Sequence, residues 1–262
     1  HTHDAIPKAI RINGTILLSS GSHGKYLGRI DLKVNNGKVV ETSSNLIPIF
    51  SDVIPPDPEI SNLINKVRAP FEKECNRVIG ETETLLYRRG NFNGSWDDII
   101  CDSIIQERDT EISLSPGFRW GTTILPGQKI TIDDIYSQTA MNYPEVYRVE
   151  MSGKMIKEIL EDVCDNIFNP DPFFQQGGDM VRVGGIKYTC SPKNEMGKRI
   201  SNLRIASTDQ PLETSKKYIV GGWGSVNPDV NGPPIYSILE KYISEKKVIN
   251  SKKSEVVEVL GM

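Results

Sequence analysis

The chain has 262 residues, of which 37% are hydrophobic and 25% are charged, a balance typical of a globular protein and not of a disordered one. Its formal net charge is -3, with Lys and Arg mixed among Asp and Glu, so the sequence offers no basic footprint for a nucleic-acid backbone. No apolar run approaches the roughly 20 residues that cross a bilayer. We therefore expect neither a nucleic acid nor a membrane as a partner.

The first 50 residues are predicted to be β structure. Residues 10–18 form one strand or two. Tyr26–Val34 alternates apolar and polar side chains with the period of a strand, Asn36-Gly37 suits a turn with positive φ angles, and Val39 begins a return strand. The sequence therefore predicts a β-hairpin.

A linker and a domain boundary are predicted over residues 51–74. Residues 51–58 hold three prolines and two aspartates, which interrupt a strand. Asp57-Pro58 is typical of the capped start of a helix. The apolar positions of this helix are Ile60, Leu63, Ile64 and Val67.

Residues 75–262 are predicted to form a second domain with mixed α and β structure and its own core. Helices are predicted after Ser95, at Ile132, from Ser152 and over Ile235–Ile243. Strands are predicted over Ile112–Leu114, Gly184–Thr189, Ile200–Ala206 and Tyr218–Gly222. Together with the hairpin, this pattern indicates the α+β class.

Four cysteines lie far apart in the sequence, without the Cys-x-x-Cys spacing of a zinc site or a redox motif. Isolated buried thiols are one interpretation. One or two disulfides are the other, because an even number of cysteines permits them. The residues are Cys75, Cys101, Cys164 and Cys190.

His1-Thr2-His3 could present two imidazoles to metal ions, because a strand or tight loop places these side chains near a shared site. Two ligands alone do not make a site. A frayed chain end is the other interpretation of this segment.

Five segments carry a resemblance to a known family. His1–Asp4 and Gly21–Leu32 resemble the end of the metallophosphoesterase domain in the 5'-nucleotidase family. Arg88–Gly94, Leu114–Thr123 and Phe173–Gly185 resemble the sulfate thiohydrolases of the SoxB type, which act in the Sox sulfur-oxidation system. The similarity runs over nearly the whole chain.

The resemblance implies a 5'-nucleotidase C-terminal-like domain over residues 75–262, preceded by a remnant of an α/β metallophosphoesterase domain over residues 1–50. It implies two divalent metal ions, with manganese as the expected element, and His1 and His3 as metal ligands. It also implies a periplasmic hydrolase that releases sulfate from the cysteine S-thiosulfonate of a sulfur-carrier protein with a C-terminal cysteine arm. This chain alone would hold no catalytic residue and would be inactive.

The departures from the nucleotidase pattern concern the nucleobase site. Nucleotidases of this family clamp the base between two phenylalanines. Met180 stands in place of the first, and Gly221–Asn227 lacks the acidic glycine turn around the second. A base-stacking slot built from these residues would be poor.

Polar residues of two loops are expected to bind the substrate. Arg119 follows a Pro-Gly turn, where its planar fork could bind two oxygens of a sulfonate or phosphate. Arg88, Arg89 and Asn91 belong to a loop that enters a helix, and helix N-termini present N–H groups to anions. A structural ion pair is the alternative for Arg119.

Aromatic side chains accompany these loops. Phe118 and Trp120 flank Arg119, and Phe173 and Phe174 lie in a loop rich in Pro and Gly. They could line a channel for the carrier's arm, or they could belong to the core.

Three functions remain open from the sequence. The chain could belong to a thiohydrolase, to a nucleotidase or related phosphoesterase, or it could act as an inactive binding module in isolation. The poor base clamp favours the first over the second.

Overall fold

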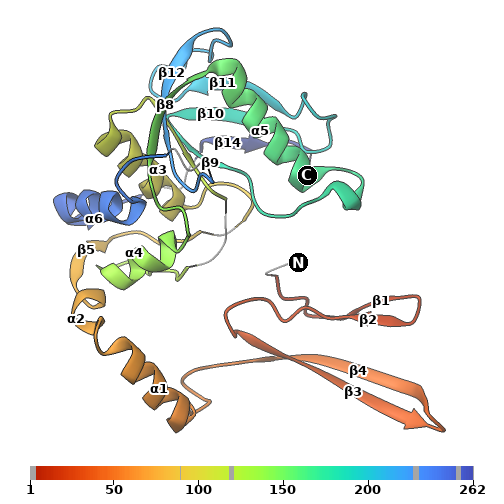
Figure 1. Ribbon diagram of the computed structural model, residues 1–262. Coiled ribbons are helices and arrows are strands. Elements are labelled where there is room, and N and C mark those ends of the chain that lie inside the picture. The colour runs from red at the N-terminus through yellow and green to blue at the C-terminus, as the bar shows by residue number, and fades with distance from the viewer. Residues whose placement is uncertain (1–3, 89, 118–120, 227–229, 252–254, 262) are drawn as a thin grey trace. The chain divides into compact units, whose positions relative to one another are not determined.

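The computed structural model describes residues 4–88, 90–117, 121–226, 230–251 and 255–261 (Figure 1). The chain divides into two compact units, residues 1–70 and 71–262. Within the described residues, no helix combines the length and the apolar character needed to span a bilayer.

The first unit begins with two β-hairpins. β1 (Ile10–Ile12) pairs with β2 (Thr15–Leu17), so residues 10–18 form two strands. β3 (Tyr26–Asn35) pairs antiparallel with β4 (Lys38–Pro48). The turn residues Asn36 and Gly37 have φ angles of 49° and 73°, as a two-residue hairpin turn requires. The predicted hairpin is confirmed.

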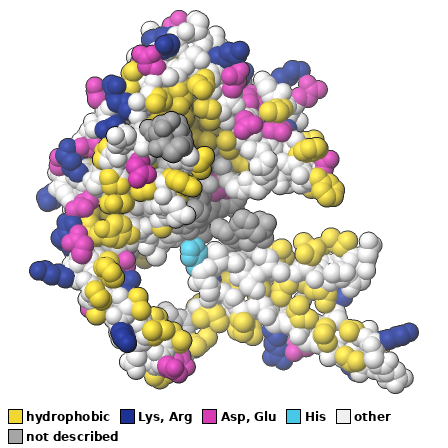
Figure 2. Space-filling model, in the orientation of Figure 1, with side chains coloured by type: hydrophobic (Ala, Val, Ile, Leu, Met, Phe, Trp, Pro, Cys, Tyr) yellow, Lys and Arg dark blue, Asp and Glu magenta, His cyan; other side chains and the backbone are white. Residues whose placement is uncertain are grey.

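The long hairpin carries apolar side chains on both strands that are exposed. Figure 2 shows hydrophobic side chains gathered over this hairpin. A two-stranded hairpin is marginally stable without further packing, so these side chains add little burial to the first unit. They are Leu27, Ile30, Leu32, Val34, Val39 and Val40.

The first unit ends with α1 (Pro58–Arg68), which starts where the sequence predicts. The Asp57 carboxylate accepts a hydrogen bond from the Ile60 amide at 3.0 Å and so caps the helix. The predicted helical period is present, but every apolar residue on it is exposed: Ile60, Leu63, Ile64 and Val67.

The second unit is built around a mixed four-stranded sheet in the order β8-β12-β6-β9. β12 (Lys217–Gly222) runs parallel to β6 (Ile112–Ser115) and antiparallel to β8 (Tyr147–Ser152). β9 (Arg182–Gly184) pairs antiparallel with the other side of β6.

Helix α3 (Ser95–Arg108) packs against β6, β9 and β12. Small sheet residues permit this close approach: a Cβ on Gly184 would lie 2.7 Å from the Cβ of Cys101, and a Cβ on Gly221 would lie 2.5 Å from a methyl group of Ile104. Sheet residues that alternate with them point the other way, toward helix α5 (Gly153–Phe168). Ile112, Leu114 and Val220 share a core cluster with Ile156, Leu160 and Cys164 of that helix.

Two smaller sheets complete this unit. β10 (Ile186–Cys190) lies between β11 (Ile200–Ile205) and β14 (Val257–Val259), and β5 (Val78–Thr82) lies between β13 (Val248–Ile249) and β7 (Lys129–Thr131). The predicted strand over residues 184–189 is interrupted at Gly185, whose φ angle is 75°. The remaining helices are α2 (Glu72–Cys75), α4 (Ile132–Thr139), the 3-10 helix η1 (Pro172–Phe174) and α6 (Ile235–Lys246).

The α+β class predicted from the sequence is confirmed by this mixture of helices and mostly antiparallel sheets. A second hydrophobic cluster joins α3, α4 and α6, and Trp96 and Leu86 are among its fully buried members. The second unit therefore contains two clusters of its own.

Candidate functional site

Arg88 and Asp97 form an ion pair in the interior of the second unit. The Nε atom of Arg88 lies 2.6 Å from Oδ1 of Asp97, and neither side chain is exposed. Oδ2 of Asp97 accepts a hydrogen bond from the Gly94 amide at 2.8 Å, at the N-terminus of α3. Burial lowers the pKa of Arg88, and the charge of Asp97 opposes that shift. The pair therefore fixes the chain where it enters α3.

Arg88 also holds two segments distant in the sequence. Its Nη1 atom donates to the carbonyl of Gln138 at 2.8 Å, and its Nη2 atom donates to the carbonyl of Pro116 at 3.0 Å. The guanidinium thus connects the end of α4 and the loop after β6 to the start of α3.

Arg182 adds a second buried arginine to the same cluster. Its Nε atom lies 3.5 Å from Oδ2 of Asp97, and its Nη2 atom lies 3.0 Å from Oδ2 of Asp179. Nη2 also donates to the carbonyl of Gly90 at 2.9 Å. We call Arg88, Asp97, Asp179 and Arg182 the buried arginine network. It connects all three loops that carry the resemblance to the thiohydrolases.

The described residues on both sides of positions 118–120 are held by close contacts. A Cβ on Gly117 would lie 2.2 Å from the carbonyl oxygen of Met180, so the two backbones touch. Gly121 has a φ angle of 90° and lies against Gln138, whose amide donates to the carbonyl of Thr122 at 2.9 Å. The loop thus has fixed ends.

The loop before α3 is tied to the segment around β9. The Asn91 carbonyl accepts a hydrogen bond from the Met180 amide at 3.0 Å. The side chain of Asn93 accepts from the Val183 amide at 3.1 Å and donates to the Val183 carbonyl at 2.9 Å. Asn91 itself is half-buried.

The structure places two of the predicted substrate-binding residues, Arg88 and Asn91. The Arg88 side chain lies inside the buried arginine network, so the geometry gives it a structural partner, Asp97. Substrate binding by Asn91 stays a prediction. The others, Arg89, Phe118, Arg119 and Trp120, lie outside the described residues.

Three residues of the network were not assigned a site role from the sequence: Asp97, Asp179 and Arg182. The sequence gives a partial indication for Asp97, because an acidic residue in the first turn of a helix interacts favourably with the positive end of the helix dipole. The sequence gives no indication that Arg182 is buried, since a charged residue in a short strand normally points to solvent.

Met180, which stands in place of the first clamp phenylalanine, and Trp223, in the segment around the second, are both buried. Met180 has no exposed surface, and Trp223 is 3% exposed, with its indole N–H donating to the Ser115 hydroxyl at 2.8 Å. Neither side chain is free to stack on a base. Phe173 and Phe174, in contrast, are 95% and 64% exposed.

Within the ranges that the structure describes, no three His, Cys, Asp or Glu side chains come close enough together to hold a metal ion. The predicted ligands His1 and His3 lie outside those ranges. The described residues therefore do not by themselves fit a dinuclear centre.

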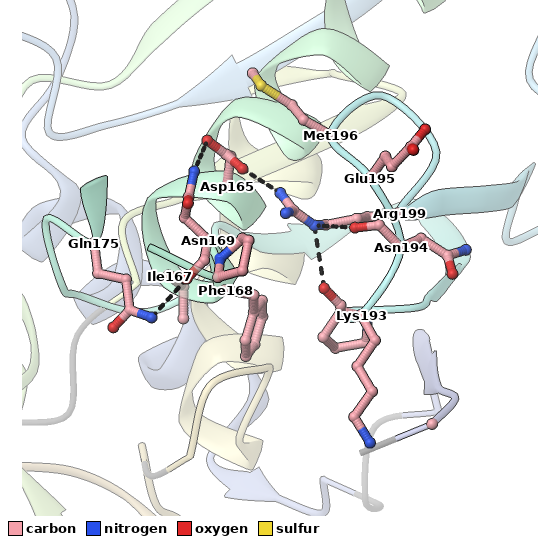
Figure 3. Close-up of a pocket in the computed structure, with 13 residues that line it drawn as sticks. Asp165, Ile167, Phe168, Asn169, Gln175, Lys193, Asn194, Glu195, Met196 and Arg199 are labelled. Carbon is pink, nitrogen blue, oxygen red and sulfur yellow. Dashed lines mark hydrogen bonds and ion pairs between the residues drawn. The ribbon is translucent and has the colours of Figure 1, made fainter. Parts of the chain in front are cut away.

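A separate cavity of about 720 Å³ opens between the C-terminal end of α5 and the loop that joins β10 to β11. Figure 3 shows Arg199 of the loop directed at Asp165 of α5. Their Nη1 and Oδ1 atoms lie 2.5 Å apart, and the Arg199 side chain is 3% exposed. Phe168 and Met196 contribute apolar walls.

Comparison with known proteins identifies the family of this domain. Residues 78–224 match the family described as the 5'-nucleotidase, C-terminal domain. The chain belongs to this family. The match includes Arg88, Asp97, Asp179 and Arg182, so the buried arginine network lies entirely within the 5'-nucleotidase C-terminal domain.

Solved structures resemble the chain over its whole length. The sulfate thiohydrolase SoxB of Thermus thermophilus, solved in complex with glycerol, is 31% identical with a TM-score of 0.92, covering 100% of this chain and 49% of that one. A 5'-nucleotidase precursor, also from Thermus thermophilus, is 18% identical with a TM-score of 0.77, covering 98% of this chain and 54% of that one, which shows a shared fold.

Curated relatives of this chain are hydrolases. The trifunctional nucleotide phosphoesterase YfkN of Bacillus subtilis is 26% identical over 86% of this chain, and the 5'-nucleotidase of Bos taurus is 24% identical over 86%. The chain spans only 16% and 44% of the lengths of these two proteins.

Proposed function

We propose that this chain is the C-terminal, substrate-binding part of a hydrolase that releases sulfate from the cysteine S-thiosulfonate of a sulfur-carrier protein. The observation that carries the proposal is the 31% identity and TM-score of 0.92 with SoxB over 100% of the chain. The 5'-nucleotidase precursor from the same species reaches 18% and 0.77. Since the two share a fold, the difference between them supports the thiohydrolase.

The burial of Met180, and of Trp223 in the segment around the second clamp position, supports the same choice. Met180 is fully buried, and the Trp223 indole is bonded inside the core. Holding adenine would require a pair of accessible aromatic faces, which these two residues do not offer.

In the proposed site, the buried arginine network positions the loops and does not itself touch the substrate. Arg119 binds oxygens of the sulfonate, because a guanidinium forms two parallel hydrogen bonds to such a group. Phe118 and Trp120 line the channel for the carrier's C-terminal cysteine arm, and Arg89 and Asn91 contribute polar contacts. The carrier protein and a periplasmic location are part of the proposal.

The proposal includes two divalent metal ions, with His1 and His3 among their ligands and manganese as the expected element. Such ions would supply Lewis-acid stabilisation of charge on the sulfonate oxygens. Because the described residues hold no cluster of further ligands, the proposal assigns those ligands to a metallophosphoesterase domain of the parent protein. The chain alone is then inactive.

The deciding experiment uses the parent protein with its metallophosphoesterase domain. A carrier peptide loaded with a cysteine S-thiosulfonate and AMP are offered in separate reactions with one enzyme preparation, and sulfate and phosphate are measured. We expect sulfate release to be much faster than phosphate release. Efficient AMP hydrolysis without sulfate release would refute the thiohydrolase.

A nucleotide phosphoesterase is the second candidate, supported by the 26% identity with the nucleotide phosphoesterase YfkN over 86% of the chain. It predicts the opposite ranking of the two products. The same experiment therefore separates both candidates, and a chain acting only as a binding module would release neither product.

A further inference from the structure

Cys164 and Cys190 face each other across the interface between α5 and β10. Their sulfur atoms lie 3.7 Å apart, and both side chains are fully buried. Cys164 lies in the last two turns of α5, and Cys190 is the last residue of β10. A disulfide requires a sulfur–sulfur distance of about 2.05 Å, so the two thiols must approach each other further to bond.

The elements that carry the two cysteines are held together by other contacts. Glu161, one turn before Cys164, accepts hydrogen bonds from the amides of Gly197, Arg199 and Ile200 at 2.9, 3.2 and 2.8 Å. The Arg199 guanidinium is bonded to Asp165 in addition. Because these bonds fix α5 against the β10–β11 hairpin on both sides of Cys164, the two sulfurs are kept opposite each other.

We propose that Cys164 and Cys190 form a disulfide that joins α5 to β10. Two S–H bonds break and one S–S bond forms, with loss of two protons and two electrons. The electrons pass to a small-molecule or protein disulfide, which is reduced to two thiols. Since both sulfurs are buried in the folded chain, the exchange takes place during folding, before α5 packs on β10.

The bond has a structural consequence for the cavity shown in Figure 3. Asp165 and Pro192, which line that cavity, lie one and two residues from the two cysteines. The disulfide thus joins the two elements that supply the walls of the cavity. Cys75 and Cys101 stay reduced, because among the described residues the structure pairs neither of these thiols with another sulfur.

The experiment refolds the full chain with oxidised glutathione, alkylates free thiols with N-ethylmaleimide in denaturant, and maps the peptides by mass spectrometry. We expect one cross-linked species containing Cys164 and Cys190, lighter by two hydrogen atoms than the two reduced peptides, and alkylated Cys75 and Cys101. Alkylation of all four cysteines, or a link between any other pair, overturns the proposal. The peptide map needs no variant, so a failure of a mutant to fold leaves the test intact.

A thermal measurement gives an independent readout. Closing the loop between Cys164 and Cys190 with a disulfide is expected to raise the Tm of the oxidised chain above that of the dithiothreitol-reduced chain by about 6–14 °C. The difference should vanish in Cys190→Ala and persist in the control Cys101→Ala. Equal Tm values for the oxidised and reduced wild-type chain would contradict the bond.

Discussion

Arg88 donates to Asp97 across 2.6 Å in a place where neither side chain reaches solvent. Breaking such a pair from one side leaves an uncompensated charge inside the protein, which is much more costly than losing a surface pair. The buried arginine network should therefore dominate the stability of the second unit around the predicted substrate loops.

Arg88→Ala is expected to lower the free energy of unfolding by about 3–5 kcal/mol, because Asp97 then remains buried with one arginine partner fewer. The matched control is Lys217→Ala, which breaks an exposed pair with Glu150 at 2.9 Å and should cost about 0–1 kcal/mol. Urea unfolding measures both. An Arg88→Ala chain as stable as the control would show that Arg88 is not a structural partner and would return it to the substrate-binding residues.

Arg119→Ala should show the opposite pattern. In the parent protein, loss of a charge-assisted contact to the sulfonate is expected to cost about 1.5–3 kcal/mol, or roughly ten- to a hundredfold in kcat/KM. The free energy of unfolding should change by less than about 0.5 kcal/mol. Activity and urea unfolding are measured on the same preparation. A variant that unfolds instead of slowing would identify Arg119 as an ion-pair partner of the fold.

Local sequence signals predicted most of the turns and helix starts that depend on residues close together in the sequence. Asn36-Gly37 predicted the turn between β3 and β4, and Asp57 predicted the start of α1, because each acts within a few residues. Ser152 similarly caps α5 through the Met155 amide. Ser95 was expected to precede α3, but it is the first helical residue, and its hydroxyl bonds to the Leu85 carbonyl.

Features that depend on distant partners could not be predicted in this way. The short strands β7 and β13 were missed, because two or three residues form a strand only where another segment supplies the hydrogen bonds, and β5, which lies between them in the sheet, was missed with them. The buried charges of Arg88 and Arg182 were not recognised as a pair around Asp97 for the same reason. The apolar period predicted α1 correctly, but it did not indicate that the apolar face of this helix is exposed.

The stability of the second unit should depend on pH through Asp165. Hydrogen bonds from Arg199 and then from Asn169 hold the pKa of Asp165 below its usual value. Because the folded pKa is lower than the unfolded value of about 3.9, the unfolded chain binds the proton more readily, and the stabilisation is present above about pH 4 and lost as the pH falls through the folded pKa.

Asp165→Asn removes this stabilisation, so its Tm should lie below that of the wild type at pH 7. The gap should narrow as the pH falls below about 4, where the wild-type carboxylate becomes protonated as well. Scanning calorimetry from neutral to acidic pH measures it, with the exposed Asp31→Asn as the control that should leave the Tm nearly unchanged throughout. A Tm difference that widens toward acidic pH would exclude stabilisation by the Asp165 carboxylate.

The chain alone should bind manganese weakly. Two imidazoles at a chain end cannot offset the entropy of ordering them around an ion without further ligands. Isothermal titration of the chain with Mn²⁺ should show no stoichiometric site of micromolar affinity, and His3→Ala should give the same trace. A tight site with one ion bound per chain would mean that the ligands have been placed wrongly.

A truncation beginning at Phe71 should fold. The second unit contains both hydrophobic clusters, and the division of the chain falls after Pro70. Differential scanning calorimetry should show a cooperative transition for residues 71–262, and limited proteolysis of the full chain should cut within residues 51–58. A soluble fragment without a cooperative transition would place the domain boundary elsewhere.

Apart from the contacts with their acidic partners, the two buried arginines donate hydrogen bonds to main-chain oxygens. Arg88 donates to the carbonyls of Gln138 and Pro116, and Arg182 donates to that of Gly90. Every amino acid supplies such an acceptor, so the side chains at these contact points can change without removing the hydrogen bonds. Loop sequences can therefore diverge while the domain keeps its geometry. For protein engineering, this makes the segment between Gly117 and Gly121, where we propose substrate-binding residues, a natural place to exchange side chains between members of the family.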